Sequence, residues 1–105
     1  RHLKQFPGLS FVAIADGQLV GTVLGTHDGR KGWINRLAVR PDFRSRGVAA
    51  ALVKACDAAI RAEGMEIVAA LVEADNEASA ALFRKLGYSD AIEVRYFRKL
   101  NHEQA

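Results

Sequence analysis

Short apolar runs separated by glycine-containing turns fill the first forty residues of this chain. Three of them predict strands, at Phe11–Ala15, Leu19–Leu24 and Trp33–Val39, because each run is short, apolar and bounded by turn residues. Asp16-Gly17 and Asp28-Gly29 predict tight hairpin turns, since both positions tolerate a positive φ. The first part of the chain therefore predicts an antiparallel meander.

A strong helical periodicity follows the third strand. Over Val48–Glu63 the apolar residues repeat every three or four positions, which predicts an amphipathic helix ending at Gly64. Its expected buried face carries Val48, Leu52, Ala55, Cys56 and Ala59, and its exposed face carries Lys54, Asp57 and Arg61.

The rest of the chain predicts two more strands and one more helix. Ile67–Val72 is a continuous apolar run, as expected for a strand covered on both faces. Asp75 or Asn76 can cap a helix that ends at Gly87. This helix is expected to bury Ala78, Leu82 and Leu86. A last strand is expected over Ile92–Lys99.

The two ends of the chain are less regular. Residues 1–10 are interpreted as the end of a helix that carries Leu3 and Phe6, and 101–105 as a frayed tail. The order β-β-β-α-β-α-β predicts one α/β domain over residues 1–105, with a mixed sheet. The meander would lead into a right-handed crossover between the strands at Trp33–Val39 and Ile67–Val72.

Composition and charge narrow the class of protein. Half of the 105 residues are hydrophobic and the net charge is only +3, without a dense Lys/Arg run, so neither nucleic acid nor a membrane is expected as a partner. No apolar run reaches about 18 residues and no signal-peptide pattern opens the chain, which favours a cytoplasmic protein. Cys56, the single cysteine, is expected to be a core residue. No cluster of His, Cys and carboxylates has metal-ligand spacing, so no metal is expected.

The turn before the first long helix has the composition of an anion-binding site. Arg40, Arg44 and Arg46 lie there, just before Gly47. A helix N-terminus presents unpaired N–H groups and the positive end of the helix dipole, which favour a phosphate. A P-loop would need Gly-Lys-Ser/Thr, and a dinucleotide fingerprint would need three spaced glycines, so both are disfavoured.

Two motifs, one in this turn and one in the second predicted helix, resemble those of the GNAT superfamily of N-acetyltransferases. Arg44-x-x-Gly47-x-Ala49 is similar to its acetyl-coenzyme A signature, Arg/Gln-x-x-Gly-x-Gly/Ala. Asp75 to Tyr88 is similar to its Asn–Ala–Leu-Tyr–Leu-Gly-Phe helix motif. The resemblance covers residues 11–99. Because the family usually has a strand and one or two helices before this point, that lobe is expected to be missing, disordered or supplied by another chain, with 1–10 as its remnant.

The resemblance implies acetyl-coenzyme A as cosubstrate and assigns its binding site. The backbone of Arg44–Ala49 would bind the pyrophosphate, and the main chain of Leu37–Val39 would pair with the pantetheine arm, with an N–H near Leu37 polarising the thioester carbonyl. Asn76 would contact the cofactor arm, cap its helix, or do both. The cofactor-binding residues so assigned are Leu37, Ala38, Val39, Arg44, Ser45, Arg46, Gly47, Val48, Ala49, Asn76 and Phe83.

The residues that usually transfer protons in this family have no counterpart here. The family's glutamate positions fall near Trp33 and on Leu71, and the position of its tyrosine acid falls on Phe83. Glu73 is a candidate base acting through water, or an exposed charge at the rim of the site without a catalytic role. Tyr88, or Tyr96, is a candidate acid, or a core aromatic.

Three functional hypotheses follow. The first is an N-acetyltransferase that moves acetyl from acetyl-coenzyme A to a small-molecule or peptide amine, by direct attack in a ternary complex. The second is a non-catalytic acyl-coenzyme A binding or regulatory module. The third, compatible with both, is a partial domain completed by a second chain, such as a homodimer.

Overall fold

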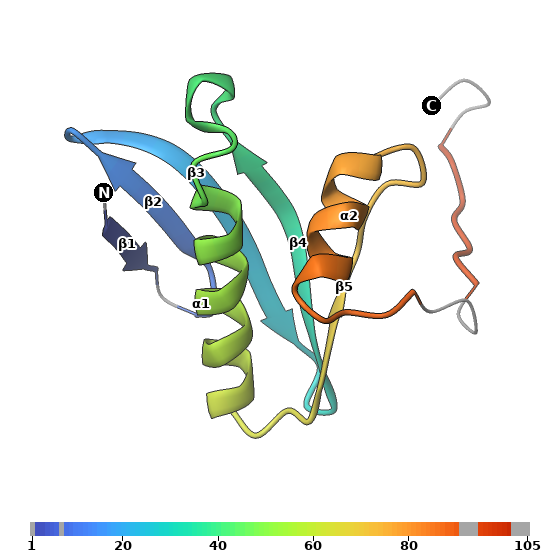
Figure 1. Ribbon diagram of the computed structural model, residues 1–105. Coiled ribbons are helices and arrows are strands. Elements are labelled where there is room, and N and C mark those ends of the chain that lie inside the picture. The colour runs from blue at the N-terminus through green and yellow to red at the C-terminus, as the bar shows by residue number, and fades with distance from the viewer. Residues whose placement is uncertain (1, 7, 91–94, 102–105) are drawn as a thin grey trace.

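A computed structural model describes residues 2–6, 8–90 and 95–101 of the chain. A five-stranded sheet has the order β1-β2-β3-β4-β5, and two α-helices lie on one of its faces (Figure 1). The elements are β1 (His2–Gln5), β2 (Phe11–Ala15), β3 (Gln18–His27), β4 (Lys31–Val39), the 3-10 turn η1 (Pro41–Phe43), α1 (Val48–Ala62), β5 (Ile67–Ala70) and α2 (Glu77–Lys85).

The mixed α/β fold and the antiparallel meander are confirmed. β1 to β4 pair antiparallel in sequence order, and β4 pairs parallel with β5 after the crossover through α1. Gly47 and Glu63 flank α1, and Gly64 has a left-handed φ of +96° directly after it. The helix thus ends where the glycine signal predicted.

The start and the end of the chain differ from the prediction. His2–Gln5 forms a strand rather than a helix end, because its backbone pairs with β2 in the register Leu3 opposite Ala13. The expected strand Ile92–Lys99 lies partly outside the described residues. Its described part, 95–99, has no strand structure, and the Tyr96 and Phe97 side chains are 85% and 81% exposed.

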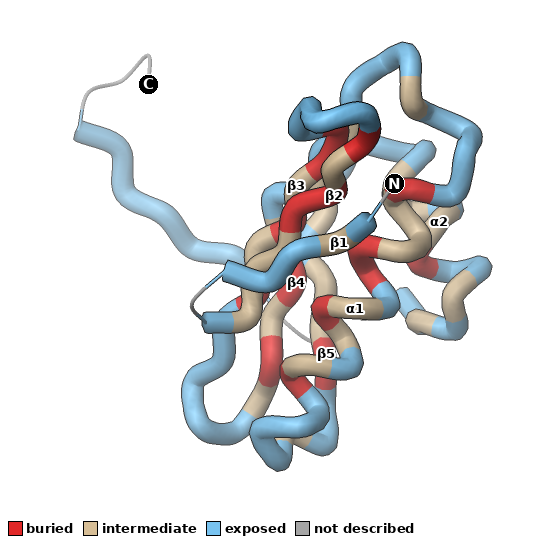
Figure 2. The backbone as a smooth tube through the Cα atoms, turned by 90° about the vertical axis from the view of Figure 1, so that its left-hand side faces the viewer, coloured by how far each residue is buried: buried red, intermediate tan, exposed pale blue. Residues whose placement is uncertain are grey.

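β5 is covered on one face only, which corrects the expectation for its apolar run. Ile67 and Leu71 are 53% and 59% exposed. The reason is visible in Figures 1 and 2, where α1 and α2 lie on the same side of the sheet. The opposite face is open among the described residues, and the strand ends at Ala70 rather than Val72.

The core lies between α1 and the middle strands, and two glycines set its close packing. A Cβ added at Gly32 of β4 would lie 2.0 Å from Ile60 Cγ2, and one at Gly25 of β3 would lie 2.6 Å from Cys56 Sγ. Burial raises the pKa of the Cys56 thiol to about 11, so this cysteine is a core residue, as predicted.

α2 is held beside α1 by the residues that follow it. The Tyr88 hydroxyl donates a hydrogen bond to Asp57 of α1, which also pairs with Arg61 at 2.6 Å. The Tyr88 ring packs edge-to-face on Phe83, with centroids 5.2 Å apart. Phe83 is therefore the buried residue of α2, whereas Ala78, expected in the core, is exposed. Among the described residues no helix is long and apolar enough to cross a membrane.

Candidate functional site

β4 and β5 separate halfway along β4. Their parallel pairing runs from Lys31 opposite Ile67 to Ile34 opposite Ala70. The Leu71 N–H donates the next bond, to the Ile34 carbonyl oxygen at 3.0 Å, and β5 has then ended while β4 continues to Val39. The second half of β4 is therefore left with one open edge.

A bulge in β4 determines which main-chain groups face this opening. Arg36 has a left-handed φ of +53°, and the register with β3 shifts between Asn35 and Ala38. Past the bulge the Arg40 N–H donates a hydrogen bond to the Val20 carbonyl oxygen of β3 at 2.8 Å. Because alternate residues of a strand direct their N–H groups to opposite sides, those of Val39 and Leu37 point away from β3 and into the opening.

The N-terminus of α1 lies at the end of this open edge. Gly47, its N-cap residue, has φ +80° and no side chain that could cap the helix, and Ser45 has φ +61°. The N–H groups of Val48, Ala49 and Ala50 have no intrahelical acceptors, and the first helical bond is that from the Ala51 N–H to the Gly47 carbonyl oxygen at 3.0 Å. Since Val48–Ala51 also contains no acidic side chain, this helix end favours a bound anion.

A groove of about 740 Å³ joins the β4 edge to both helices, a size typical of small-molecule sites. All the predicted cofactor-binding residues line it except Arg46 and Phe83. Its walls are formed by Leu37, Ala38, Val39, Phe43, Arg44, Ser45, Gly47, Val48, Ala49, Ala50, Asn76, Ala78, Ser79, Leu82 and Lys85.

The arginines of the turn have different roles. Arg44 lines the groove, and its Nε lies 3.4 Å from the Val39 carbonyl oxygen. Arg46 lies over the Phe43 ring, 4.9 Å from its centroid, while Arg40 pairs with Asp42 at 2.8 Å. The charge of Arg40 is thus already compensated.

The N-terminus of α2 forms the other wall. Asn76 accepts a hydrogen bond from the Ser79 N–H at 3.1 Å, which confirms its predicted cap, and it also lines the groove. Sequence reasoning missed Ser79, Leu82 and Lys85 as lining residues. Their spacing of three from Asn76 onward was the available signal, because such residues lie along one side of a helix.

The candidate proton-transfer groups lie outside the groove lining. Glu73 is exposed in the loop after β5 rather than on the strand, and its carbonyl oxygen accepts from the Asn76 N–H. Tyr88 instead donates to Asp57, and burial and this bond raise its pKa above the ordinary value for tyrosine. Phe83 is only 6% exposed, packed against Tyr88 in the core.

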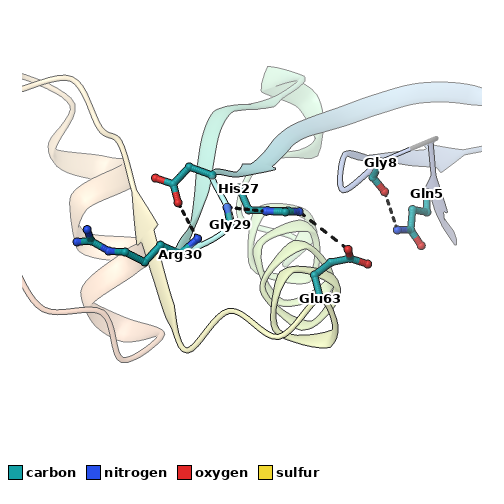
Figure 3. Close-up of polar contacts among 7 residues, drawn as sticks. Gln5, Gly8, His27, Gly29, Arg30 and Glu63 are labelled. Atoms are coloured by element: carbon teal, nitrogen blue, oxygen red, sulfur yellow. Dashed lines mark hydrogen bonds and ion pairs between the residues drawn. The ribbon is translucent and has the colours of Figure 1, made fainter.

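A second hollow, of about 600 Å³, lies between the β1–β2 connection and the end of α1. Figure 3 shows its polar contacts: Gln5 donates to the Gly8 carbonyl, and His27 accepts from the Gly29 N–H and lies 3.9 Å from Glu63. The Gln5 and His27 hydrogen bonds each join residues close in sequence and stabilise exposed turns. No group of three His, Cys, Asp or Glu residues within the described ranges could hold a metal ion.

Known proteins resemble this chain in sequence and in structure. The sequence profile of the acetyltransferase (GNAT) family matches residues 1–88. An acetyltransferase of Pectobacterium atrosepticum is 39% identical over 84% of this chain, and one of Yersinia enterocolitica is 35% identical over 99% of it. The chain spans 62% of the length of the first relative and 74% of the second.

A solved structure similar to this fold is that of an aminoglycoside N-acetyltransferase in complex with CoA. It has a TM-score of 0.76 and 26% identity, over 87% of this chain and 75% of that one. The same enzyme in complex with a bisubstrate analogue, CoA-S-monomethyl-acetylneamine, matches with the same TM-score and identity, over 68% of its length.

Proposed function

Because the chain belongs to the acetyltransferase (GNAT) family, we propose that it transfers acetyl from acetyl-coenzyme A to a primary amine. The observation that carries this proposal is the meeting of the open edge of β4 with the uncapped N-terminus of α1 in one groove. The CoA bound by the aminoglycoside N-acetyltransferase of similar fold supports the choice of cosubstrate.

The pyrophosphate would bind at the turn and the start of α1. The N–H groups from Ser45 to Ala49 would supply donors there, and the helix dipole would supply positive potential. The Arg44 N–H already donates to the Pro41 carbonyl oxygen at 3.3 Å, so Arg44 would contribute through its side chain. A Cβ at Gly47 would have no atom within 4 Å, so the space in front of this residue is open. Arg44 and Lys85, the charged side chains of the lining, are both cationic. The groove is thus complementary to an anionic cosubstrate.

The pantetheine arm would lie along β4 as an added strand. Val39 and Leu37 direct their N–H groups into the opening, where the amide carbonyls of the arm could accept from them. The Leu37 N–H would then polarise the thioester carbonyl and stabilise the negative charge that develops on its oxygen. Function at this position therefore depends on the backbone rather than on the side chain.

The reaction would be a direct transfer. The neutral amine nitrogen attacks the thioester carbon, the carbon–sulfur bond breaks, and coenzyme A leaves as the thiolate while the nitrogen loses a proton. Coenzyme A thiolate is a tolerable leaving group, so a protein acid is helpful rather than obligatory.

A second candidate function is a non-catalytic acyl-coenzyme A binding module. The observation that favours it is the location of Glu73, Tyr88 and Phe83 outside the lining of the groove. Isothermal titration with acetyl-coenzyme A, followed by a thiol-release assay over a panel of primary amines, separates the two. Binding with amine-dependent release supports the enzyme. Binding without release under any amine supports the module, and absence of binding contradicts both.

A further inference from the structure

We propose that Lys85 binds the ribose phosphate of coenzyme A, and that this contact makes the groove select coenzyme A over its dephospho form. The inference rests on the proposed function, because it assigns one more group of the same cosubstrate. It starts from the charge of the groove lining. Arg44 and Lys85 are its cationic side chains, and none of its described residues carries a carboxylate. The two cations belong to different walls, since Arg44 lies in the turn before α1 and Lys85 in the last turn of α2.

The ammonium group of Lys85 is exposed and uncompensated. Its neighbour Arg84 pairs with Asp90, with Nε and Oδ2 3.2 Å apart. The residues four and three positions before Lys85 are Ala81 and Leu82, so the helix offers no carboxylate one turn away. Among the described residues Lys85 has no hydrogen-bond or ion-pair partner. Its charge is therefore available to an anion that enters the groove.

The groove follows α2 from its N-cap to its last turn. Asn76, Ser79, Leu82 and Lys85 line it at a spacing of three residues, over about 13 Å of helix. On the side of α1 the lining ends at Ala50, in the first helical turn. The groove thus has two parts that meet at the start of α1. One part lies along the open edge of β4, and the other lies beside α2.

The chemistry of coenzyme A matches these two parts. The molecule extends in two directions from its pyrophosphate, with the pantetheine arm on one side and the phosphorylated adenosine on the other. Because the pantetheine arm is assigned to the β4 edge, the part beside α2 is left for the adenosine. Ala78 and Leu82 give this part apolar surface, which suits the adenine ring. Lys85 supplies a compact point charge on a flexible stem, which suits a phosphate group.

Arg44 is placed for the pyrophosphate rather than for the ribose phosphate. It belongs to the turn that holds the pyrophosphate donors, and its Nε lies 3.4 Å from the Val39 carbonyl oxygen. This contact keeps the guanidinium group near the β4 edge. Lys85 is therefore the lining cation that remains for the second anionic group of the cosubstrate.

Two thioesters that differ only in this phosphate test the inference, namely acetyl-coenzyme A and acetyl-dephospho-coenzyme A. In isothermal titration the native protein should bind the first about fivefold to twentyfold more tightly, as expected for one exposed charge-assisted contact. Lys85→Gln should lose most of this ratio through weaker binding of acetyl-coenzyme A, with the Kd for the dephospho form unchanged. Lys85→Arg keeps the cation and should keep most of the ratio.

Lys54→Gln is the matched control, because Lys54 is an exposed lysine of α1 outside the groove lining. It should keep the native ratio. Since the contact is exposed, the ratio of the native protein should also fall between about 0.05 M and about 0.5 M NaCl, whereas that of Lys85→Gln should stay nearly constant.

The outcomes separate this inference from the proposed function. Equal affinities of the native protein for both thioesters, or a native ratio that persists in Lys85→Gln, would overturn the inference alone. An equal loss for both thioesters in Lys85→Gln would also overturn it, because the lysine would then act on the pyrophosphate or on the fold. Absence of binding of either thioester to the native protein would remove the proposed function as well.

Discussion

The Leu71 N–H donates to the Ile34 carbonyl oxygen at 3.0 Å, and this bond is the last between β4 and β5 in the described part of the chain. The part of β4 that lines the groove, Leu37–Val39, follows this bond along the strand. The bulge at Arg36 turns the N–H groups of Leu37 and Val39 into the space that the bond leaves open. One early strand end thus converts a continuous sheet into a site with exposed main-chain donors.

Gly47→Glu is expected to abolish binding of acetyl-coenzyme A. The new carboxylate would enter the open space before the helix N-terminus, where the pyrophosphate is proposed to bind. Gly29→Glu is the matched control, because Gly29 also has a positive φ, of +87°, and open space around it. Isothermal titration should show binding by the control alone. Equal affinities in both variants would refute the pyrophosphate assignment.

Tyr88→Phe is expected to lower the free energy of unfolding by about 1 kcal/mol, through loss of the hydrogen bond to Asp57. In the native protein, burial and this bond raise the pKa of Tyr88, so its contribution is present below about pH 10 and is lost as the pH rises further. Denaturant unfolding against pH should show a steeper alkaline decline in the native protein than in the variant. Tyr96→Phe, at an 85% exposed position, should keep the native profile, and an identical decline in all three would contradict this role.

Phe83→Tyr is expected to destabilise the protein without raising turnover. The sequence alone suggests that this change could restore the acid usual in the family, but Phe83 is 6% exposed in the core and lies outside the groove lining. A hydroxyl buried there without a partner should cost about 1–3 kcal/mol. Thermal unfolding and thiol release measured on one preparation check both parts. A faster reaction in the variant would place Phe83 beside the leaving group.

Glu73→Gln tests whether the acceptor amine loses its proton to solvent or to Glu73. If the acceptor loses its proton to solvent, the pH dependence of kcat/KM should follow the pKa of the amine and stay unchanged in the variant. Glu73 lies exposed in the loop after β5, so the change should not disturb the fold. Loss of the acid limb of the profile, or a large fall in rate, would identify Glu73 as the base.

The meander and the α1 helix could be predicted because local patterns determine them. Asp16-Gly17 and Asp28-Gly29 encode the hairpins, and the periodicity of Val48–Glu63 encodes an amphipathic helix. His2–Gln5 could not be predicted, because a four-residue strand depends on its partner β2 rather than on its own sequence. The exposure of Ile67 and Leu71 depends equally on where both helices pack.

The groove was predictable where the backbone forms it. Gly47 and the arginines of the turn before it are visible in the sequence, so the anion-binding turn could be located. Asn76 could be predicted as an N-cap because asparagine is common at that position. The position of the wall formed by Lys85 carries no such signal, since it depends on how Tyr88 holds α2 against α1.

The most direct test is an amide-resolved NMR titration of the ¹⁵N-labelled protein with acetyl-coenzyme A. The N–H signals of Leu37, Val39, Gly47 and Val48 should shift together with one Kd, while that of Gly29 stays in place. Shifts confined to the hollow around Gln5 and His27, or no shift at the β4 edge and the start of α1, would contradict the proposed binding site.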